Sequence, residues 1–213
     1  GFSIVSYTGT GSLATVGHGL SVAPELVIIK NRTTAARSWS VGTTAGVDFT
    51  YVAYLDATNA FATDINYFNN TDPSATVFTI GTNSYVNDSD DFIAYCFHSV
   101  DGYSKVGSYE GNGNLDGTFV YTGFRPMWVM AKCSNASAPW LMTDSVRFPY
   151  NVTDDPLFAN ESSAETNSST YAIDILSNGF KCRGVNNNAN NSSNDTYIYL
   201  AFAESPLKYS RGR

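Results

Sequence analysis

The chain is poor in charged residues and in histidine, and each shortage argues against a class of function. Charged residues make up 15% of the 213 residues, and the net charge is −7. Nucleic-acid binding relies on lysine and arginine to neutralise phosphates, so we expect no nucleic-acid partner. The two histidines, His18 and His98, lack the spacing of a zinc site, and no metal site is predicted from them.

Long apolar runs, cysteine motifs and helical patterns are also lacking. No run approaches the length of a membrane span, so we expect no membrane insertion. The three cysteines form no CxxC motif. Cys96 lies in an apolar run and is expected to be a small buried thiol, whereas a bridge between Cys133 and Cys182 is left open. The best helical candidate, residues 155–165, supports at most a short helix.

What the chain does contain is an internal repeat. Three segments recur 102 to 105 positions later: residues 6–11 as 108–113, 26–30 as 128–132, and 92–97 as 197–202. This periodicity predicts two copies of one unit, residues 1–101 and 102–213, each about the size of a small domain. No proline- or serine-rich linker separates the copies, so we expect them to pack together.

Short runs rich in Val, Ile, Tyr, Phe and Thr, separated by Gly, Asn, Asp and Pro, extend along the whole chain. They predict an all-β fold of two repeated β-sandwich, jelly-roll-like units. The dipeptide Asn178-Gly179 is the strongest hairpin signal. The expected strands are residues 2–7, 13–16, 26–31, 38–41, 49–55, 77–80 and 92–100 in the first copy, and 105–109, 117–122, 127–133, 140–143, 171–176, 179–183 and 196–204 in the second.

A residue present in both copies is expected to serve the shared scaffold, and a residue found in one copy is the better functional candidate. Trp39 and Trp140 occupy matching places and are predicted to be buried anchors. Lys30 and Lys132 end matching apolar runs, so we expect their stems to pack while each ammonium reaches solvent or one carboxylate. Trp128 replaces an aliphatic residue of the first copy and has no such structural role.

The candidate ligand-binding residues are aromatic or amide side chains. Trp128, Tyr85 and Tyr150 could stack on sugars, although core packing is the alternative for strand aromatics. Asn186 and Asn187 open the segment NNNANNSSND, residues 186–195. That segment is almost without apolar side chains, so it is expected to be an exposed loop on which a ligand could bind.

Catalytic and cofactor signals are weak. Three carboxylate pairs could serve glycoside hydrolysis if the fold brought one pair together across a cleft, and solvated loop charge is the alternative. They are Asp90 with Asp91, Asp154 with Asp155, and Glu161 with Glu165. No catalytic residue is therefore assigned, and no cofactor is expected. The oxygen-rich residues 87–91 could hold calcium, although the EF-hand spacing is absent.

Four stretches together resemble a known family: HGLSVAPELVIIKNR, AYCFHSVDGYSKVGSYEGNGNLDGTFVYTGFRP, ILSNGFK and YIYLAFAESP. The chain is similar to a domain of unassigned function that recurs in structural proteins of tailed, often marine, bacteriophages. The resemblance covers nearly the whole chain and carries no catalytic motif. It implies a place on the virion surface, in a tail fibre or as a decoration protein, beside other virion proteins.

Two function classes follow from the residues and the resemblance. The first is a non-enzymatic virion-surface protein that engages other virion proteins or a host surface glycan, as a homo-oligomer or in many copies. The second is a polysaccharide-degrading enzyme of the phage tail. Two convergent carboxylates in a cleft would indicate the enzyme, and an aromatic depression without them would indicate an adhesin.

Overall fold

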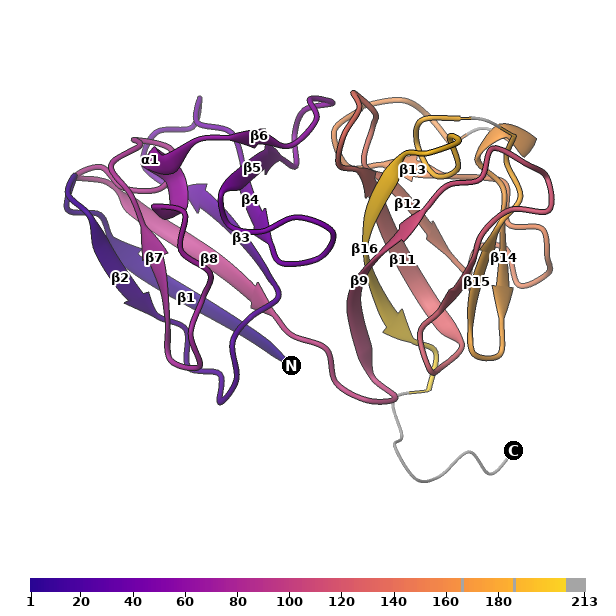
Figure 1. Ribbon diagram of the computed structural model, residues 1–213, viewed down its shortest axis with the longest axis horizontal. Helices are drawn as coiled ribbons and strands as arrows, with labels where there is room; N and C mark the ends of the chain where they lie inside the picture. Colours follow the sequence, from indigo (N-terminus) through magenta and orange to yellow (C-terminus); the bar gives the residue numbers. More distant parts are fainter. Residues whose placement is uncertain (166, 186, 206–213) are drawn as a thin grey trace. The chain divides into compact units, whose positions relative to one another are not determined.

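The computed structural model describes residues 1–165, 167–185 and 187–205, and the chain divides into two compact units, Gly1–His98 and Ser99–Arg213 (Figure 1). Both are built of antiparallel β-strands, so the all-β prediction is confirmed. Among the described residues, helix is confined to α1 (Ile65–Phe68) and the 3-10 turn η1 (Ser169–Tyr171). None of the described helices is long and apolar enough to cross a membrane.

Unit 1 holds two antiparallel sheets with its core between them. On β8, alternate residues Phe92, Ala94 and Cys96 are buried in a cluster that also contains Phe78 and Ile80 from the smaller sheet. The period of two places one face of each strand in the core. The larger sheet has the order β1 (Phe2–Thr8), β8 (Asp91–Phe97), β3 (Leu26–Asn31), β4 (Ser40–Thr43), β5 (Tyr51–Tyr54) and β6 (Ala62–Thr63), and the smaller pairs β2 (Ala14–Gly17) with β7 (Val77–Ile80).

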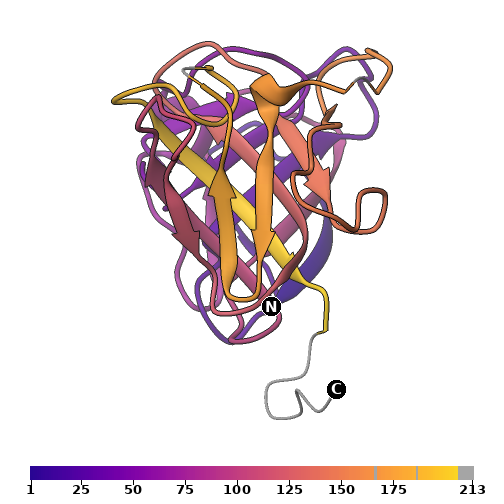
Figure 2. The same ribbon diagram turned by 90° about the vertical axis from the view of Figure 1, so that its right-hand side faces the viewer.

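Unit 2 has the same two-layer construction. Figure 2 shows the hairpin of the smaller sheet in front of the larger sheet, whose β16 strand crosses behind it. Phe180 of the smaller sheet packs edge-on against Tyr109 and Tyr199 of the larger one, with ring centroids 5.8 and 5.4 Å away. The larger sheet has the order β13 (Leu157–Phe158), β12 (Leu141–Asp144), β11 (Pro126–Cys133), β16 (Thr196–Ala203) and β9 (Ser104–Glu110), and the smaller β10 (Phe119–Tyr121), β15 (Gly179–Cys182) and β14 (Ile173–Leu176).

The larger sheets of the two units run through their strands in the same order. In each, the first strand of the unit pairs with the last, and the order β1-β8-β3-β4-β5 corresponds to β9-β16-β11-β12-β13. Gly9 and Gly111, at matching positions, leave no room for a side chain. A Cβ atom would lie 1.9 Å from the Asp88 carbonyl oxygen at Gly9, and 2.2 Å from that of Ser192 at Gly111. This close approach of another backbone segment requires glycine at both positions.

Two buried asparagines hold matching loops in the two units. Asn87 and Asn191 each accept backbone hydrogen bonds at Oδ1 and donate through Nδ2 to carbonyls of two other segments. The expectation of an exposed loop is therefore wrong for residues 189–192, which are buried, and Asn190 and Asn191 are fully so. Their side-chain amides hydrogen-bond to backbone N–H and C=O groups that an apolar side chain would leave without a partner. Asn87 bonds Thr10, Gly11, Ser12 and Gly81, and Asn191 bonds Asn112, Asn114 and Gly184.

The matching tryptophans differ in burial. Trp140 is 1% exposed, as predicted, but Trp39 is only partly buried, so the prediction of a buried anchor is wrong there. Its indole lies against Tyr95, with ring centroids 6.2 Å apart. Tyr95 is on the face of β8 opposite the core cluster, so the Trp39 ring is not enclosed between the two sheets.

Lysine 132 also departs from expectation. Its side chain is fully buried, and Nζ donates to the carbonyl of Ala138 at 2.7 Å. Lys30 donates to the carbonyls of Ala35 and Arg37. Both ammonium groups thus bond to carbonyls of the loop that follows their own strand. That of Lys132 is removed from solvent, against the expectation, whereas Lys30 is only partly buried. Burial lowers the pKa of Lys132 to about 8.

Three local predictions concern turns, helix and cysteines. Residues 155–165 contain β13 and no helix, because this segment pairs with β12. The predicted hairpin is present, but Leu176 pairs with Gly179, so its turn residues are Ser177 and Asn178. The three cysteines are free and buried, which agrees with the expectation for Cys96 and leaves no bridge to Cys182.

Candidate functional site

Trp128 lies on β11 where the pairing of the sheet is irregular. Its neighbours on the adjoining strands are Asp144 of β12 and Phe202 of β16. The register between β11 and β16 shifts just before Trp128, and such bulges change the direction of side chains. Met127, inside the irregularity, is exposed. The first unit has the buried Leu26 at the position of Trp128, so at this position in the sheet only unit 2 has a partly exposed indole.

Trp128 and its neighbours line an open depression of about 500 Å3 in the surface of unit 2. The ring of Trp128 lies 5.9 Å from that of Phe202 at an interplanar angle of 36°. Tyr103 packs edge-on against the same phenylalanine at 6.0 Å. The lining is mainly apolar, with a carboxylate among its residues: Met127, Trp128, Asp144, Val146 and Phe202. A sugar ring has an apolar C–H face and polar hydroxyls, so a flat indole beside a carboxylate suits it.

Asp144 is fixed in this depression by the loop that follows β12. Its carboxylate accepts hydrogen bonds from the backbone amides of Val146 at 3.0 Å and Arg147 at 2.8 Å. It also accepts one from Arg147 Nε at 2.5 Å. Partial burial raises the pKa of Asp144, but these hydrogen bonds and the arginine charge outweigh it, and the net pKa is lowered. Arg147 also forms an ion pair with Glu165 at 3.0 Å. Its guanidinium therefore contacts two carboxylates, Asp144 and Glu165, and these contacts hold the loop after β12 in place.

The other candidates of unit 2 do not converge on this depression. Tyr150 is 84% exposed in the segment between β12 and β13. Asn187 is buried, and its amide donates to the Thr170 carbonyl and to Asn190 Oδ1. Its carbonyl accepts a hydrogen bond from the hydroxyl of Tyr197 at the start of β16, whereas Trp128 faces Phe202, five residues farther along that strand, or about 17 Å at 3.3 Å per residue. Asn186 lies outside the described residues.

Tyr85 belongs to a separate aromatic cluster in unit 1. Its ring contacts those of Tyr54 and Tyr67 at centroid distances of 5.9 and 6.3 Å. The guanidinium of Arg37 lies 5.1 Å from the centroid of Tyr85. The hydroxyls of Tyr54 and Tyr67 are 2.6 Å apart, and burial followed by this hydrogen bond raises the pKa of Tyr67. The face of Tyr85 is thus already partnered within the unit by a cation–π contact.

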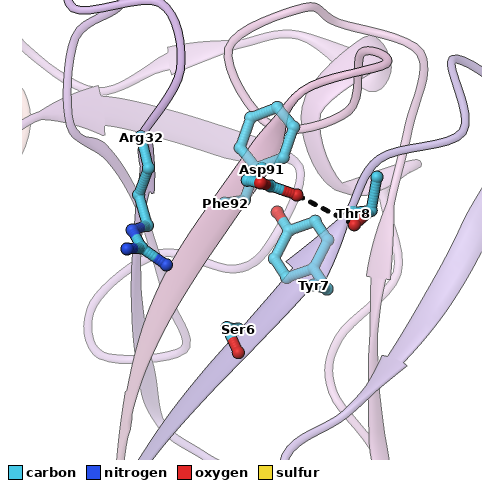
Figure 3. A pocket seen from close by; sticks show the side chains of 6 residues that line it. All are labelled: Ser6, Tyr7, Thr8, Arg32, Asp91 and Phe92. Carbon is cyan, nitrogen blue, oxygen red and sulfur yellow. Dashed lines mark hydrogen bonds between the residues drawn. The ribbon is translucent and has the colours of Figure 1, made fainter.

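A polar pocket of about 360 Å3, which the sequence did not predict, lies where β1, β8 and the end of β3 adjoin (Figure 3). The Thr8 hydroxyl donates to the Asp91 carboxylate at 2.9 Å, and the Arg32 side chain lies on the other side of β8. The available signal was Arg32, because the second copy has Ser134 at the matching position. The lining residues are Ser6, Tyr7, Thr8, Arg32, Asp91 and Phe92.

The oxygen-rich residues 87–91 are largely engaged within the fold. Asn87 binds four backbone groups, and Asp90 accepts hydrogen bonds from Asn31 and from the Thr34 hydroxyl, both at 2.8 Å. These bonds lower the pKa of Asp90. Across residues 1–165, 167–185 and 187–205, no three His, Cys, Asp or Glu side chains gather in a group that could hold a metal ion. Calcium binding by this loop stays a prediction.

Comparisons with known proteins give one match. A family model described as "Domain of unknown function (DUF7483)" matches residues 1–206, which takes in both units up to the segment after β16. No curated protein and no solved structure matches the chain.

Proposed function

The chain belongs to the DUF7483 family, and on that premise we propose that it is a non-enzymatic surface component of a bacteriophage particle that binds host glycans through the depression around Trp128. The partly exposed indole carries this proposal. The scaffold of unit 1 has no tryptophan at this position. In unit 2 the indole lies in a depression formed by a bulged strand and by a loop that hydrogen bonds and an ion pair hold in place. A site that is already ordered loses little conformational entropy on binding.

The place on the particle rests on the resemblance to structural proteins of tailed bacteriophages. A polar surface with few charges is consistent with an extracellular β-protein. In this proposal the chain is a tail-fibre or decoration component that contacts other virion proteins. With many copies on one particle, several weak glycan contacts would form together, and the overall affinity would exceed that of each site. A shallow site is then sufficient for adhesion.

We also propose that the two units are copies of one jelly-roll-like sandwich. The common strand order of the larger sheets and the matching roles of Asn87 and Asn191 support the duplication. Under this reading unit 1 retains the scaffold without the tryptophan, because Leu26 stands where unit 2 has Trp128. Glycan binding is then a property of unit 2.

The test is binding of the whole chain to an array of purified bacterial lipopolysaccharides and capsular polysaccharides. The wild-type chain should be retained on a subset of them, and Trp128→Ala should weaken retention by about tenfold or more, because the stacking surface is lost. Tyr121→Ala is the matched control, since it removes an exposed aromatic from the other sheet of unit 2. Equal binding by wild type and Trp128→Ala, or no retention on any glycan, would contradict the proposal.

A further inference from the structure

The outer edge of unit 1 is a long strand without the features that normally protect a sheet edge. β1 lies at one end of the six-stranded sheet, and within the described residues it pairs with β8 alone (Figure 1). Its seven residues, FSIVSYT, include no charge and no proline. Natural proteins usually protect such edges with charged residues, proline, bulges or a covering segment.

The hydrogen bonds at the two ends of the β1–β8 pair show which backbone groups of β1 point away from the sheet. The amide of His98 donates to the Gly1 carbonyl and that of Gly9 donates to the Asp90 carbonyl, both at 2.9 Å. Because hydrogen-bonded positions alternate in an antiparallel pair, the odd-numbered residues of β1 bond to β8. The even-numbered residues therefore direct their N–H and C=O groups away from the sheet, and these are Phe2, Ile4, Ser6 and Thr8.

The same four residues also carry the exposed side chains of the strand. Burial alternates along β1, and Ile4 is 55% exposed. Phe2 is exposed as well, and its ring stacks on Phe97 at 4.7 Å. An extended segment added at this edge would thus gain both backbone hydrogen bonds and apolar contacts with Phe2 and Ile4, as in β-strand addition.

Unit 2 provides an internal comparison. Its matching edge strand, β9, has the sequence SKVGSYE and carries Lys105 and Glu110. A lysine on an edge strand opposes pairing with a further strand. The two edges have the same place in their sheets, so the absence of charge from β1 sets it apart from β9.

We propose that β1 is a pairing edge for β1 of a second copy of this chain, joined antiparallel about a two-fold axis at Val5. In this register Phe2 faces Thr8 of the other copy and Ile4 faces Ser6, so each outward residue exchanges its backbone hydrogen bonds with a partner. The strand is uncharged, and the two-fold places the two Asp91 carboxylates, beside Thr8, at opposite ends of the strand pair. A self-complementary contact of this kind closes as a symmetric dimer.

The experiment measures the dimer dissociation constant of the whole chain by sedimentation equilibrium. Ser6→Lys should weaken the dimer by about tenfold or more, because a lysine at the joint blocks strand addition. Ser108→Lys is the matched control on β9, where an exposed serine has the same place in the repeat, and it should leave the dimer unchanged. Circular dichroism should show both variants folded, since neither serine is buried. A monomeric wild type, or equal effects of the two lysines, would overturn the proposal.

A second pair of variants tests the register. Ile4→Lys and Ser6→Glu should each weaken self-association, whereas their mixture should form a heterodimer, because position 4 of one copy faces position 6 of the other. Opposite charges directly across a strand pair stabilise it. A mixture that associates no better than the separate variants would contradict the two-fold register.

Discussion

Replacing Asn191 with alanine tests whether the buried asparagine loop holds unit 2 together. The side chain is fully buried, accepts a hydrogen bond from the Asn112 amide at 3.1 Å, and donates to the carbonyls of Asn114 and Gly184 at 2.8 and 2.7 Å. Each such bond contributes about 0.5–1.5 kcal/mol net, and buried groups left without partners add to the loss. We therefore expect Asn191→Ala to lower the free energy of unfolding of unit 2 by about 2–4 kcal/mol.

The assay is urea denaturation followed by tryptophan fluorescence, which reports on unit 2 through Trp128 and Trp140 and on unit 1 through Trp39. Asn188→Ala is the control within the same loop, because Asn188 is exposed and its side chain accepts one hydrogen bond, from the Ser192 hydroxyl. It should cost less than about 1 kcal/mol, as most surface substitutions do. Equal stability of Asn191→Ala and Asn188→Ala would refute the structural role of the loop.

Three further predictions concern buried side chains. Trp140→Ala should cost about 3–5 kcal/mol through cavity formation, and Trp39→Ala should cost clearly less because its indole is only partly buried; chemical denaturation of the two variants decides this. Lys132 has a pKa of about 8 in the folded chain, against an ordinary value of 10.5. Between these pH values the unfolded chain binds more protons than the folded chain, so the contribution of Lys132 to the free energy of unfolding rises with pH. The stability difference between wild type and Lys132→Met should change accordingly between about pH 8 and pH 10.5, and a constant difference would disprove the buried charge. Burial also raises the pKa of all three cysteine thiols, so a disulfide reagent at pH 8 should modify them only after unfolding; rapid reaction of the native chain would contradict their burial.

The strands could be predicted because the alternation of apolar and polar residues matches the alternation of side chains between the two faces of a strand. A run such as Asp91–Phe97 places every second side chain on one face, and Phe92, Ala94 and Cys96 are indeed the buried ones. Charge, proline and glycine mark the turns between such runs. The helix α1 was missed because four residues are too few to show a helical period; its signals are the Asp64 cap, which accepts a hydrogen bond from Asn66 N, and the left-handed Asn69.

Burial of polar residues could not be read from the chain. Composition alone cannot distinguish an asparagine in solvent from one that bonds buried backbone groups, and so the segment around Asn191 was predicted to be exposed. The same holds for Lys132, whose carbonyl partner lies in the next loop. Trp128 was identified as a candidate because the repeat offered a comparison with Leu26, but its neighbours Phe202 and Val146 come from distant parts of the sequence. The repeat, more than any motif, identified the candidate site.

The central claim, binding of a host glycan without cleavage, is tested most directly by one incubation of the purified chain with bacterial capsular polysaccharide or lipopolysaccharide. Retention of the protein and release of reducing ends are followed together in the same sample. We predict retention that depends on Trp128, with no reducing ends released above the level of a heat-denatured control. Release of saccharide that a single Asp or Glu substitution abolishes would contradict the account and establish a polysaccharide-degrading enzyme.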